Sequence, residues 1–413
     1  MKHLGPDYGS ALTRVVADAP RGSGGAHPFF RPGCGDGARG EGGHLTMGEL
    51  RRDPISGQWV IIAAERAARP HDFRVETPPP EEGFCPFCEG NEGTTPEEVM
   101  AYRREDSEPN GPGWRIRVVP NKYPALTAEG DLDKEGLGVY DRMRGVGRHE
   151  IVIESPQHVT TPTALPEDLM ADVIRAYRDR SIDLMADERF SYLQIFKNVG
   201  QAAGASLRHS HSQLMCTPVV PKRMQEEMGN FEAFYEYRGR CPMCDIVRQE
   251  LADGERVVDR TENLVCFTPF ASRFPFEMWI VPRSHIPHFY KIDDGYLHEL
   301  ARLLQRSLKA LEKCLEAPPY NYVVHSAPFP GRLYMDGRLD MYHWHLEIIP
   351  RVTRLAGFEW GTEFYINPAV PEDCAGHLRN ALSELPAEEE EAVSNTKREA
   401  AGVEQGKSER GTA

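Results

Sequence analysis

The spacing of hydrophobic residues along the chain changes between the two-residue period of strands and the period of about 3.6 residues typical of helices. Residues 192–198 (YLQIFKN) alternate in this way and predict a strand. Leu169, Val173 and Tyr177 recur at helical spacing and predict a helix that begins near Pro166. The same criteria predict strands within 58–62, 115–119, 150–158, 264–267, 276–281, 320–325 and 343–349, helices at 297–311 and from 371 to about 385, a loop at 125–140, and a strand and loop at 357–368.

One order of features occurs twice: Cys-x-x-Cys, a strand followed by His, a helix, a strand, and His-x-His. Such a repeat indicates two related halves. We therefore expect an N-terminal half at 47–220 and a C-terminal half at 221–384. Residues 1–46 and 385–413 lack apolar periodicity and are expected to be disordered. Met47 precedes the first patterned segment, so translation of residues 1–46 is an open question.

Composition excludes several classes of protein. The formal net charge of −15 argues against a nucleic-acid or anionic-membrane surface, since both need a basic footprint. We find neither an apolar run of membrane-helix length nor an N-terminal secretion signal, and expect a cytoplasmic protein. In a reducing compartment, the nine cysteines favour metal ligation over disulfides.

Each half offers two thiolates and two imidazoles, the ligand set of a closed tetrahedral zinc site. The alternative is small buried cysteines and core histidines. We predict Zn²⁺, one or two ions per chain. The first set is Cys85, Cys88, His158 and His209; the second is Cys241, Cys244, His285 and His343, with His288 in reserve for His285.

The segment after residues 192–198 carries the candidate chemistry. If its backbone stays extended, His209, His211 and Gln213 share one face. Two imidazoles and a carboxamide at one place suit phosphate chemistry, with one His as anchor and the other as nucleophile. Alternatively, this is a surface strand with incidental histidines. Arg66 and Arg69, which follow the strand at 58–62, could bind phosphate or be merely solvated.

Together these residues resemble the galactose-1-phosphate uridylyltransferase family of the histidine-triad superfamily. The resemblance extends from Asp53 to about Leu382. It rests on several motifs in order: Asp53-Pro54 with Gly57-Gln58-Trp59, Cys85-Pro86-Phe87-Cys88, Pro120-Asn121-Lys122-Tyr123-Pro124, Phe196-Lys197-Asn198 and His209-Ser210-His211-Ser212-Gln213.

The resemblance implies an α+β fold of duplicated histidine-triad-like halves, with antiparallel sheets and packed helices, and a homodimer. It also implies ping-pong transfer of a nucleotidyl group between a nucleotide sugar and a sugar 1-phosphate, with UDP-glucose and galactose 1-phosphate as the expected pair. His211 would be the nucleophile and Gln213 would bind the phosphoryl oxygens. By matching position, the expected contacts to the nucleotide, phosphate and hexose are Arg66, Arg69, Asn121, Asn198, Ser206 and Glu359.

Four alternatives stay open. Ser210 stands where the best-known uridylyltransferases have proline, and the serine form is similar to the ADP-glucose phosphorylase branch, which transfers adenylyl to phosphate. A histidine-triad hydrolase or a zinc-stabilised nucleotide-binding module without turnover is disfavoured by Gln213 and His211. Some relatives build the second metal site from a glutamate and three histidines, and the matching positions are Glu227, His325, His343 and His345.

Overall fold

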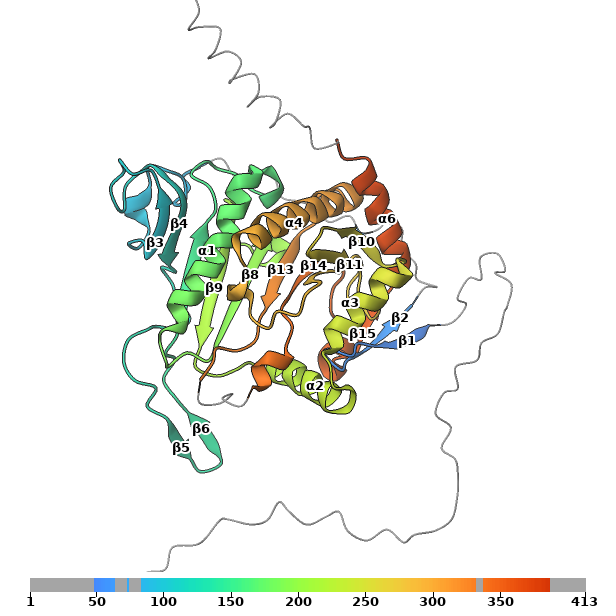
Figure 1. Ribbon diagram of the computed structural model, residues 1–413. Coiled ribbons are helices and arrows are strands. Elements are labelled where there is room, and N and C mark those ends of the chain that lie inside the picture. Colours follow the sequence, from blue (N-terminus) through green and yellow to red (C-terminus); the bar gives the residue numbers. More distant parts are fainter. Residues whose placement is uncertain (1–47, 64–72, 74–82, 332–336, 387–413) are drawn as a thin grey trace, which may run out of the picture. The chain divides into compact units, whose positions relative to one another are not determined.

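The computed structural model describes residues 48–63, 73, 83–331 and 337–386, all within the unit Leu45–Ala413. Its main feature is a ten-stranded sheet in which every neighbouring pair is antiparallel (Figure 1). In spatial order its strands are β10 (Val257–Arg260), β11 (Leu264–Phe267), β12 (Met278–Pro282), β14 (His345–Pro350), β13 (Tyr320–His325), β8 (Tyr192–Val199), β9 (His211–Thr217), β7 (Arg148–Ile153), β4 (Trp114–Pro120) and β3 (Met100–Arg103).

The two sequence repeats meet at the centre of this sheet. β8 of the first repeat pairs with β13 of the second, in a register that places Tyr320 opposite Val199. β9 and β14, which follow the two His-x-His motifs, lie on the outer sides of that pair. The predicted α+β fold of duplicated halves, with antiparallel sheets and packed helices, is confirmed. The division at residue 220 stays a prediction.

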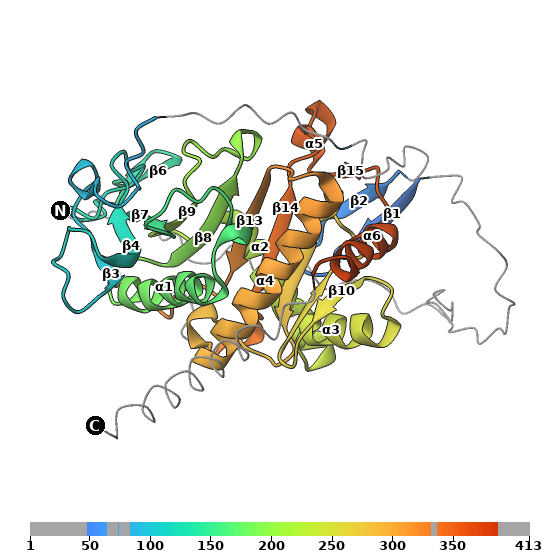
Figure 2. The same ribbon diagram turned by 90° about the horizontal axis from the view of Figure 1, so that it is seen from above.

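Helices cover the sheet because its strands are apolar on both faces. In β11, Leu264 and Cys266 pack into the cluster that contains α1 (Glu167–Met185), α4 (Asp294–Leu315) and α6 (Pro371–Ser383). Val265 and Phe267 pack into a second cluster with α2 (Lys222–Arg238) and α3 (Pro242–Asp253). This is the alternation expected of a strand between two helical layers. Figures 1 and 2 show α1 and α4 side by side over the central strands.

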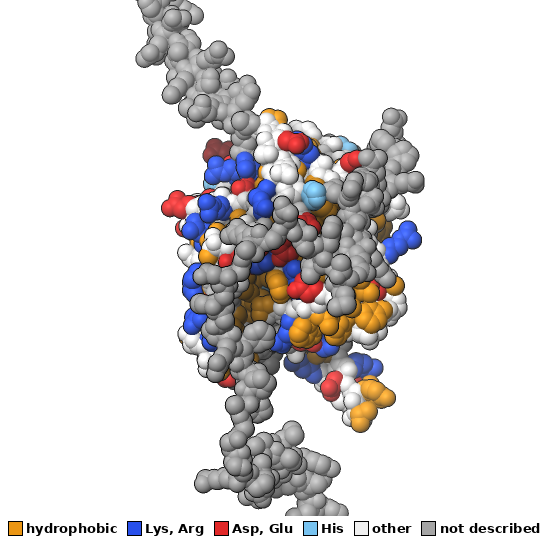
Figure 3. All heavy atoms as spheres, turned by 90° about the vertical axis from the view of Figure 1, so that its right-hand side faces the viewer, with side chains coloured by type: hydrophobic (Ala, Val, Ile, Leu, Met, Phe, Trp, Pro, Cys, Tyr) orange, Lys and Arg blue, Asp and Glu red, His pale blue; other side chains and the backbone are white. Residues whose placement is uncertain are grey.

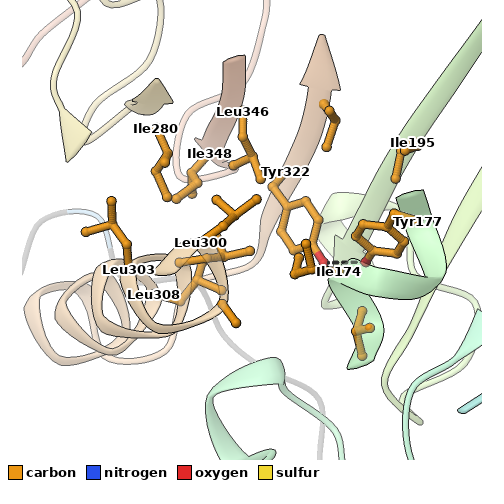
Figure 4. Close-up of a cluster of buried hydrophobic side chains, with 14 of the residues drawn as sticks. Ile174, Tyr177, Ile195, Ile280, Leu300, Leu303, Leu308, Tyr322, Leu346 and Ile348 are labelled. Carbon is orange, nitrogen blue, oxygen red and sulfur yellow. Dashed lines mark hydrogen bonds between the residues drawn. The ribbon is translucent and has the colours of Figure 1, made fainter. Parts of the chain in front are cut away.

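The first of these clusters ties the two repeats together. Leu300, Leu303 and Leu308 of α4 pack toward Ile280, Leu346 and Ile348 of the second repeat, and Ile174 and Tyr177 of α1 complete the cluster (Figure 4). The Tyr177 hydroxyl lies 2.7 Å from that of Tyr322, which links α1 to β13 inside the apolar core.

Two segments among the remaining elements differ from the sequence-based prediction. Residues 357–362, predicted as strand and loop, form a helix, α5 (Gly357–Thr362), because the Glu359 carboxylate accepts a hydrogen bond from the Ala356 N–H at the helix start. The predicted loop 125–140 contains a strand of the hairpin β5 (Glu135–Leu137)–β6 (Tyr140–Arg142). A small sheet joins β1 (Glu49–Arg52), β2 (Trp59–Ile62) and β15 (Tyr365–Asn367).

On the face shown in Figure 3, basic and acidic side chains are interspersed over the part that the structure describes. No described helix is both long and apolar enough to cross a membrane.

Candidate active site and metal-ligand clusters

The first predicted ligand set converges at the edge of the N-terminal repeat. Nδ1 of His209 lies 3.5 Å from Sγ of Cys85 and 3.6 Å from Sγ of Cys88, and Nδ1 of His158 lies 3.5 Å from Sγ of Cys88. Nε2 of His209 donates to the carbonyl oxygen of Ser155 at 2.8 Å, which leaves Nδ1 unprotonated in the neutral ring. Burial lowers the pKa of His209 to about 4, so the ring is neutral at pH 7.

The second set has the same construction. Sγ of Cys244 lies 3.5 Å from Nδ1 of His343 and 3.6 Å from Nδ1 of His285, and Sγ of Cys241 lies 3.7 Å from Nδ1 of His343. Nε2 of each imidazole again faces a backbone carbonyl oxygen, that of Asp340 for His285 and that of Pro282 for His343. His288 is buried, lies outside this set and stacks on Tyr290.

The donor atoms of both sets fit a tetrahedral metal ion. Within each set, the ligand atoms all lie within 4.8 Å of one another. A zinc-sized ion with usual bond lengths to sulfur and nitrogen would separate those atoms by about 3.5 Å, and the observed sulfur–nitrogen distances run from 3.5 to 3.7 Å. His209, His285 and His343 each donate from Nε2 to a carbonyl oxygen, which is the usual outer support of metal-binding histidines. Both sets could therefore hold a metal ion.

The glutamate and histidines of the alternative second metal site do not all lie together. Glu227, His325 and His345 lie together, whereas His343 faces the cysteines. His325 bridges the carboxylates of Glu227 and Glu347, at 3.3 Å from each. Burial opposes a charge on His325, but these two carboxylates prevail and raise its pKa to about 9. Glu227, His325 and Glu347 thus form a buried network of ion pairs. Arg223 and Arg273 also belong to it, since each forms an ion pair with Glu347.

One nitrogen of the His211 ring is hydrogen-bonded to the backbone and the other is not protonated. Its Nδ1 donates to the carbonyl oxygen of His209 at 2.7 Å, so the Nε2 lone pair is exposed on the other side of the ring. Burial lowers the pKa of His211, and the nearby Lys197 ammonium lowers it further, which keeps the imidazole neutral. The Phe87 ring, between Cys85 and Cys88, packs edge-on against both His209 and His211.

A cavity of about 620 Å³ opens beside His211. Its wall includes the segment between β8 and β9, in which Gly200 and Gly204 adopt positive φ. Asn198, Ser206 and Arg208 line the same cavity, and Glu312 of α4 closes one side. The arrangement places an imidazole, a guanidinium group and polar side chains around one cavity, which suits a phosphorylated substrate.

A buried ion pair lies beside β9. Nζ of Lys197 lies 2.6 Å from Oε2 of Glu154 and donates to the carbonyl oxygen of His211 at 2.9 Å. Lys197 is 1% exposed and Glu154 is fully buried. Burial disfavours the Glu154 carboxylate, but Lys197 outweighs it and lowers the pKa of Glu154. Ser210 donates to Glu154 at 2.6 Å, so the serine of His-Ser-His serves this network.

Replacing Lys197 with methionine is expected to destabilise the fold by about 3–5 kcal/mol, because Glu154 would be left as an uncompensated buried charge. The double variant Lys197→Met/Glu154→Gln should recover most of that loss, since it buries no charge. Urea denaturation measures both. Lys222→Met, which removes an exposed lysine, is the control and should change stability by less than about 0.5 kcal/mol. An unchanged denaturation midpoint for Lys197→Met would refute this reading.

The other residues predicted for substrate contacts are scattered. Oδ1 of Asn198 accepts a hydrogen bond from Asn321, and Asn198 and Ser206 line the cavity. Asn121 lies at the end of β4 and contacts His149. Glu359 lies in α5 and is not among the described residues that line the cavity. Arg66 and Arg69 lie outside the described residues.

Sequence reasoning gave no role to Lys197, Glu154 or His149, although each contacts the His-x-His-x-Gln segment. Lys197 was visible as a charge inside an apolar strand, a pattern that demands a buried partner. His149 carried no such signal, because its contact depends on how β7 pairs with β9.

Comparisons with known proteins show which proteins this chain is similar to. The family described as "Galactose-1-phosphate uridyl transferase, N-terminal domain" matches residues 43–221. A second family, described only as a domain of unknown function, matches residues 154–404.

Individual relatives match over most of the chain. An ADP-glucose phosphorylase from Arabidopsis thaliana is 37% identical over 80% of this chain and 92% of its own length. A galactose-1-phosphate uridylyltransferase from Thermotoga maritima is 28% identical over 82% of this chain and all of its own. The crystal structure of an ADP-glucose phosphorylase from Arabidopsis thaliana with bound ADP-glucose aligns with a TM-score of 0.68 and 34% identity, covering 81% of this chain and 98% of that one.

Proposed function

Because the chain belongs to the galactose-1-phosphate uridylyltransferase family and is an enzyme of the nucleotidyltransferase kind, we propose that it transfers adenylyl from ADP-glucose to inorganic phosphate. The observation that carries the chemistry is His211, whose Nδ1–H is bound to the His209 carbonyl oxygen and which lines a cavity of about 620 Å³.

The reaction proceeds in two displacements. Nε2 of His211 attacks the α-phosphorus of the nucleotide sugar, the bond from that phosphorus to the sugar phosphate oxygen breaks, and glucose 1-phosphate leaves. An oxygen of inorganic phosphate then attacks the same phosphorus, the N–P bond breaks, and ADP leaves. Gln213, on the same strand face as His211, donates to the phosphoryl oxygens as negative charge develops there.

We propose Zn²⁺ as the ion of both Cys₂His₂ sets, because thiolates and imidazoles are its usual tetrahedral ligands. The first set would consist of Cys85, Cys88, His158 and His209, and the second of Cys241, Cys244, His285 and His343. When bound, the ion supplies a rigid cross-link rather than a reactive centre. In the first set, it would fix His209 and hence the carbonyl oxygen that orients His211.

The relatives favour adenine over uracil. The ADP-glucose phosphorylase shares 37% of its aligned residues with this chain, against 28% for the uridylyltransferase from Thermotoga maritima. Ser210 fits the same branch, although its hydroxyl is bound to Glu154 and Lys197 behind the strand, so its influence on the base is indirect. Uridylyl transfer from UDP-glucose to galactose 1-phosphate is the second candidate, supported by the family match over residues 43–221.

Steady-state kinetics decides between the two substrate pairs. We expect kcat/KM for ADP-glucose with phosphate to exceed that for UDP-glucose with galactose 1-phosphate by about 100-fold or more, because a pocket that bonds the edge of one base leaves its polar groups unpaired with the other. His211→Ala is the blank for both assays. A preference for the uridine pair would overturn the adenylyl assignment in favour of the second candidate.

A further inference from the structure

We propose that His149 is a positioning residue that fixes the orientation of the Gln213 carboxamide. The inference rests on the proposed function, in which Gln213 binds the phosphoryl oxygens of the reacting nucleotide. Its structural basis is a 2.8 Å contact between Nε2 of His149 and Oε1 of Gln213.

Strand pairing brings the two side chains together. β7 and β9 are antiparallel, with Ile151 opposite Gln213 and Ile153 opposite His211. His149 lies two residues before Ile151, so it is on the same face of the sheet as Gln213 and His211. A long side chain on that face can reach its diagonal neighbour on the adjacent strand. The pairing register of β7 and β9 therefore brings His149 and Gln213 into contact.

The tautomer of His149 follows from its surroundings. Nδ1 is buried and has no hydrogen-bond partner within the described part of the chain. An unpaired N–H is rarer in protein interiors than an unpaired acceptor, so Nδ1 is the unprotonated nitrogen and Nε2 carries the hydrogen. Nε2–H therefore donates to Gln213, and the oxygen of the carboxamide is the atom that faces His149.

Asn121 offers a competing donor to the same nitrogen, at a longer distance than the contact to Gln213. Its Oδ1 accepts from the backbone N–H of Tyr123 at 2.9 Å, which places Nδ2 at 3.2 Å from Nε2 of His149. Since Nε2 already carries a hydrogen, it cannot accept from Asn121. Nδ2 of Asn121 consequently keeps its hydrogens available for another acceptor.

The orientation of Gln213 matters because an amide has two opposite ends. With Oε1 bound by His149, the NH₂ group is the end left for the phosphoryl oxygens. A flipped carboxamide would present its oxygen to an anion and oppose the same transition state. His149 acts through Gln213 and need not touch the substrate.

A double-mutant cycle tests the proposal. His149→Phe keeps a ring but removes the donor, and should slow single-turnover formation of the nucleotidyl-protein roughly tenfold to 100-fold, with the KM for nucleotide sugar changed less than about twofold. In a Gln213→Ala background, the same substitution should cause no further loss. His149→Gln, whose side-chain N–H can reach the position of Nε2, should recover part of the rate. Arg148→Ala, on the same strand, is the control with native kinetics.

Each outcome bears on the proposal. A native rate for His149→Phe, or equal losses in the native and Gln213→Ala backgrounds, would overturn it while leaving the nucleotidyl-histidine chemistry intact. A lower melting temperature that fully accounts for the lost rate would indicate a structural role only, and would also overturn it. If the native protein forms no nucleotidyl-protein with either nucleotide sugar, the proposed function fails and this inference fails with it.

Discussion

His211→Ala should abolish covalent labelling of the protein and lower kcat/KM by on the order of 10⁴-fold or more. Of the described residues that line the cavity, the other imidazole is His209, and its unprotonated Nδ1 faces Cys85 and Cys88. Incubation of the native protein with nucleotide sugar labelled in the α-phosphate, without acceptor, should leave label that is lost in acid and retained in base. Mass spectrometry of the digest should place that label on His211.

The second repeat offers a matched control. His345 follows His343 as His211 follows His209, and its Nδ1 likewise faces a carbonyl oxygen, at 3.3 Å. Its surroundings are different, because the His325 ring stacks on it at 4.7 Å and leaves no comparable access. His345→Asn should still be labelled, per folded molecule. Label that survives His211→Ala, or that moves to His345, would contradict the assignment of the nucleophile.

Cys85→Ser is expected to remove one metal ion per chain and to lower the free energy of unfolding by more than about 4 kcal/mol, since loss of a structural metal belongs to the small group of very damaging changes. The native protein should hold two ions, one for each four-residue set. Elemental analysis after dialysis against a weak chelator, together with thermal denaturation, measures both quantities. Activity should fall as well, because the His209 carbonyl oxygen orients His211.

Cys314→Ser provides the comparison, because Cys314 is a partly buried cysteine that belongs to neither set. It should keep both ions and lose little stability. A Cys85→Ser protein with native metal content, or a metal-free protein that melts at the native temperature, would be incompatible with structural metal sites.

The sequence alone was sufficient wherever the chemistry depends on local spacing. His211 and Gln213 share a face because β9 is extended, and a strand pattern of period two can be read directly. The membership of both ligand sets could be inferred because Cys-x-x-Cys and His-x-His recur in the same order. Helices α1, α4 and α6 were predicted because each buries a continuous apolar stripe.

The local sequence pattern did not predict the correct element where contacts with neighbouring residues had the larger effect. Helices α2 and α3 were not predicted. In α2, the buried side carries few apolar residues, namely Met224, Met228 and Phe231. Residues 357–362 contain Phe358 and Trp360, which favour strands, yet the hydrogen bond of Glu359 to the Ala356 N–H starts a helix. Glu359 therefore lies in α5 rather than on the wall of the cavity beside His211.

Only the tertiary structure could decide which side chains support the site. It separates His343, which faces the cysteines, from His345, which joins Glu227 and His325. It also pairs Lys197 with Glu154 behind β9 and places His149 against Gln213. These contacts join residues between 20 and 118 positions apart in the sequence. They depend on strand register and on which elements pack together, and both are fixed by the burial of the whole core rather than by any local pattern.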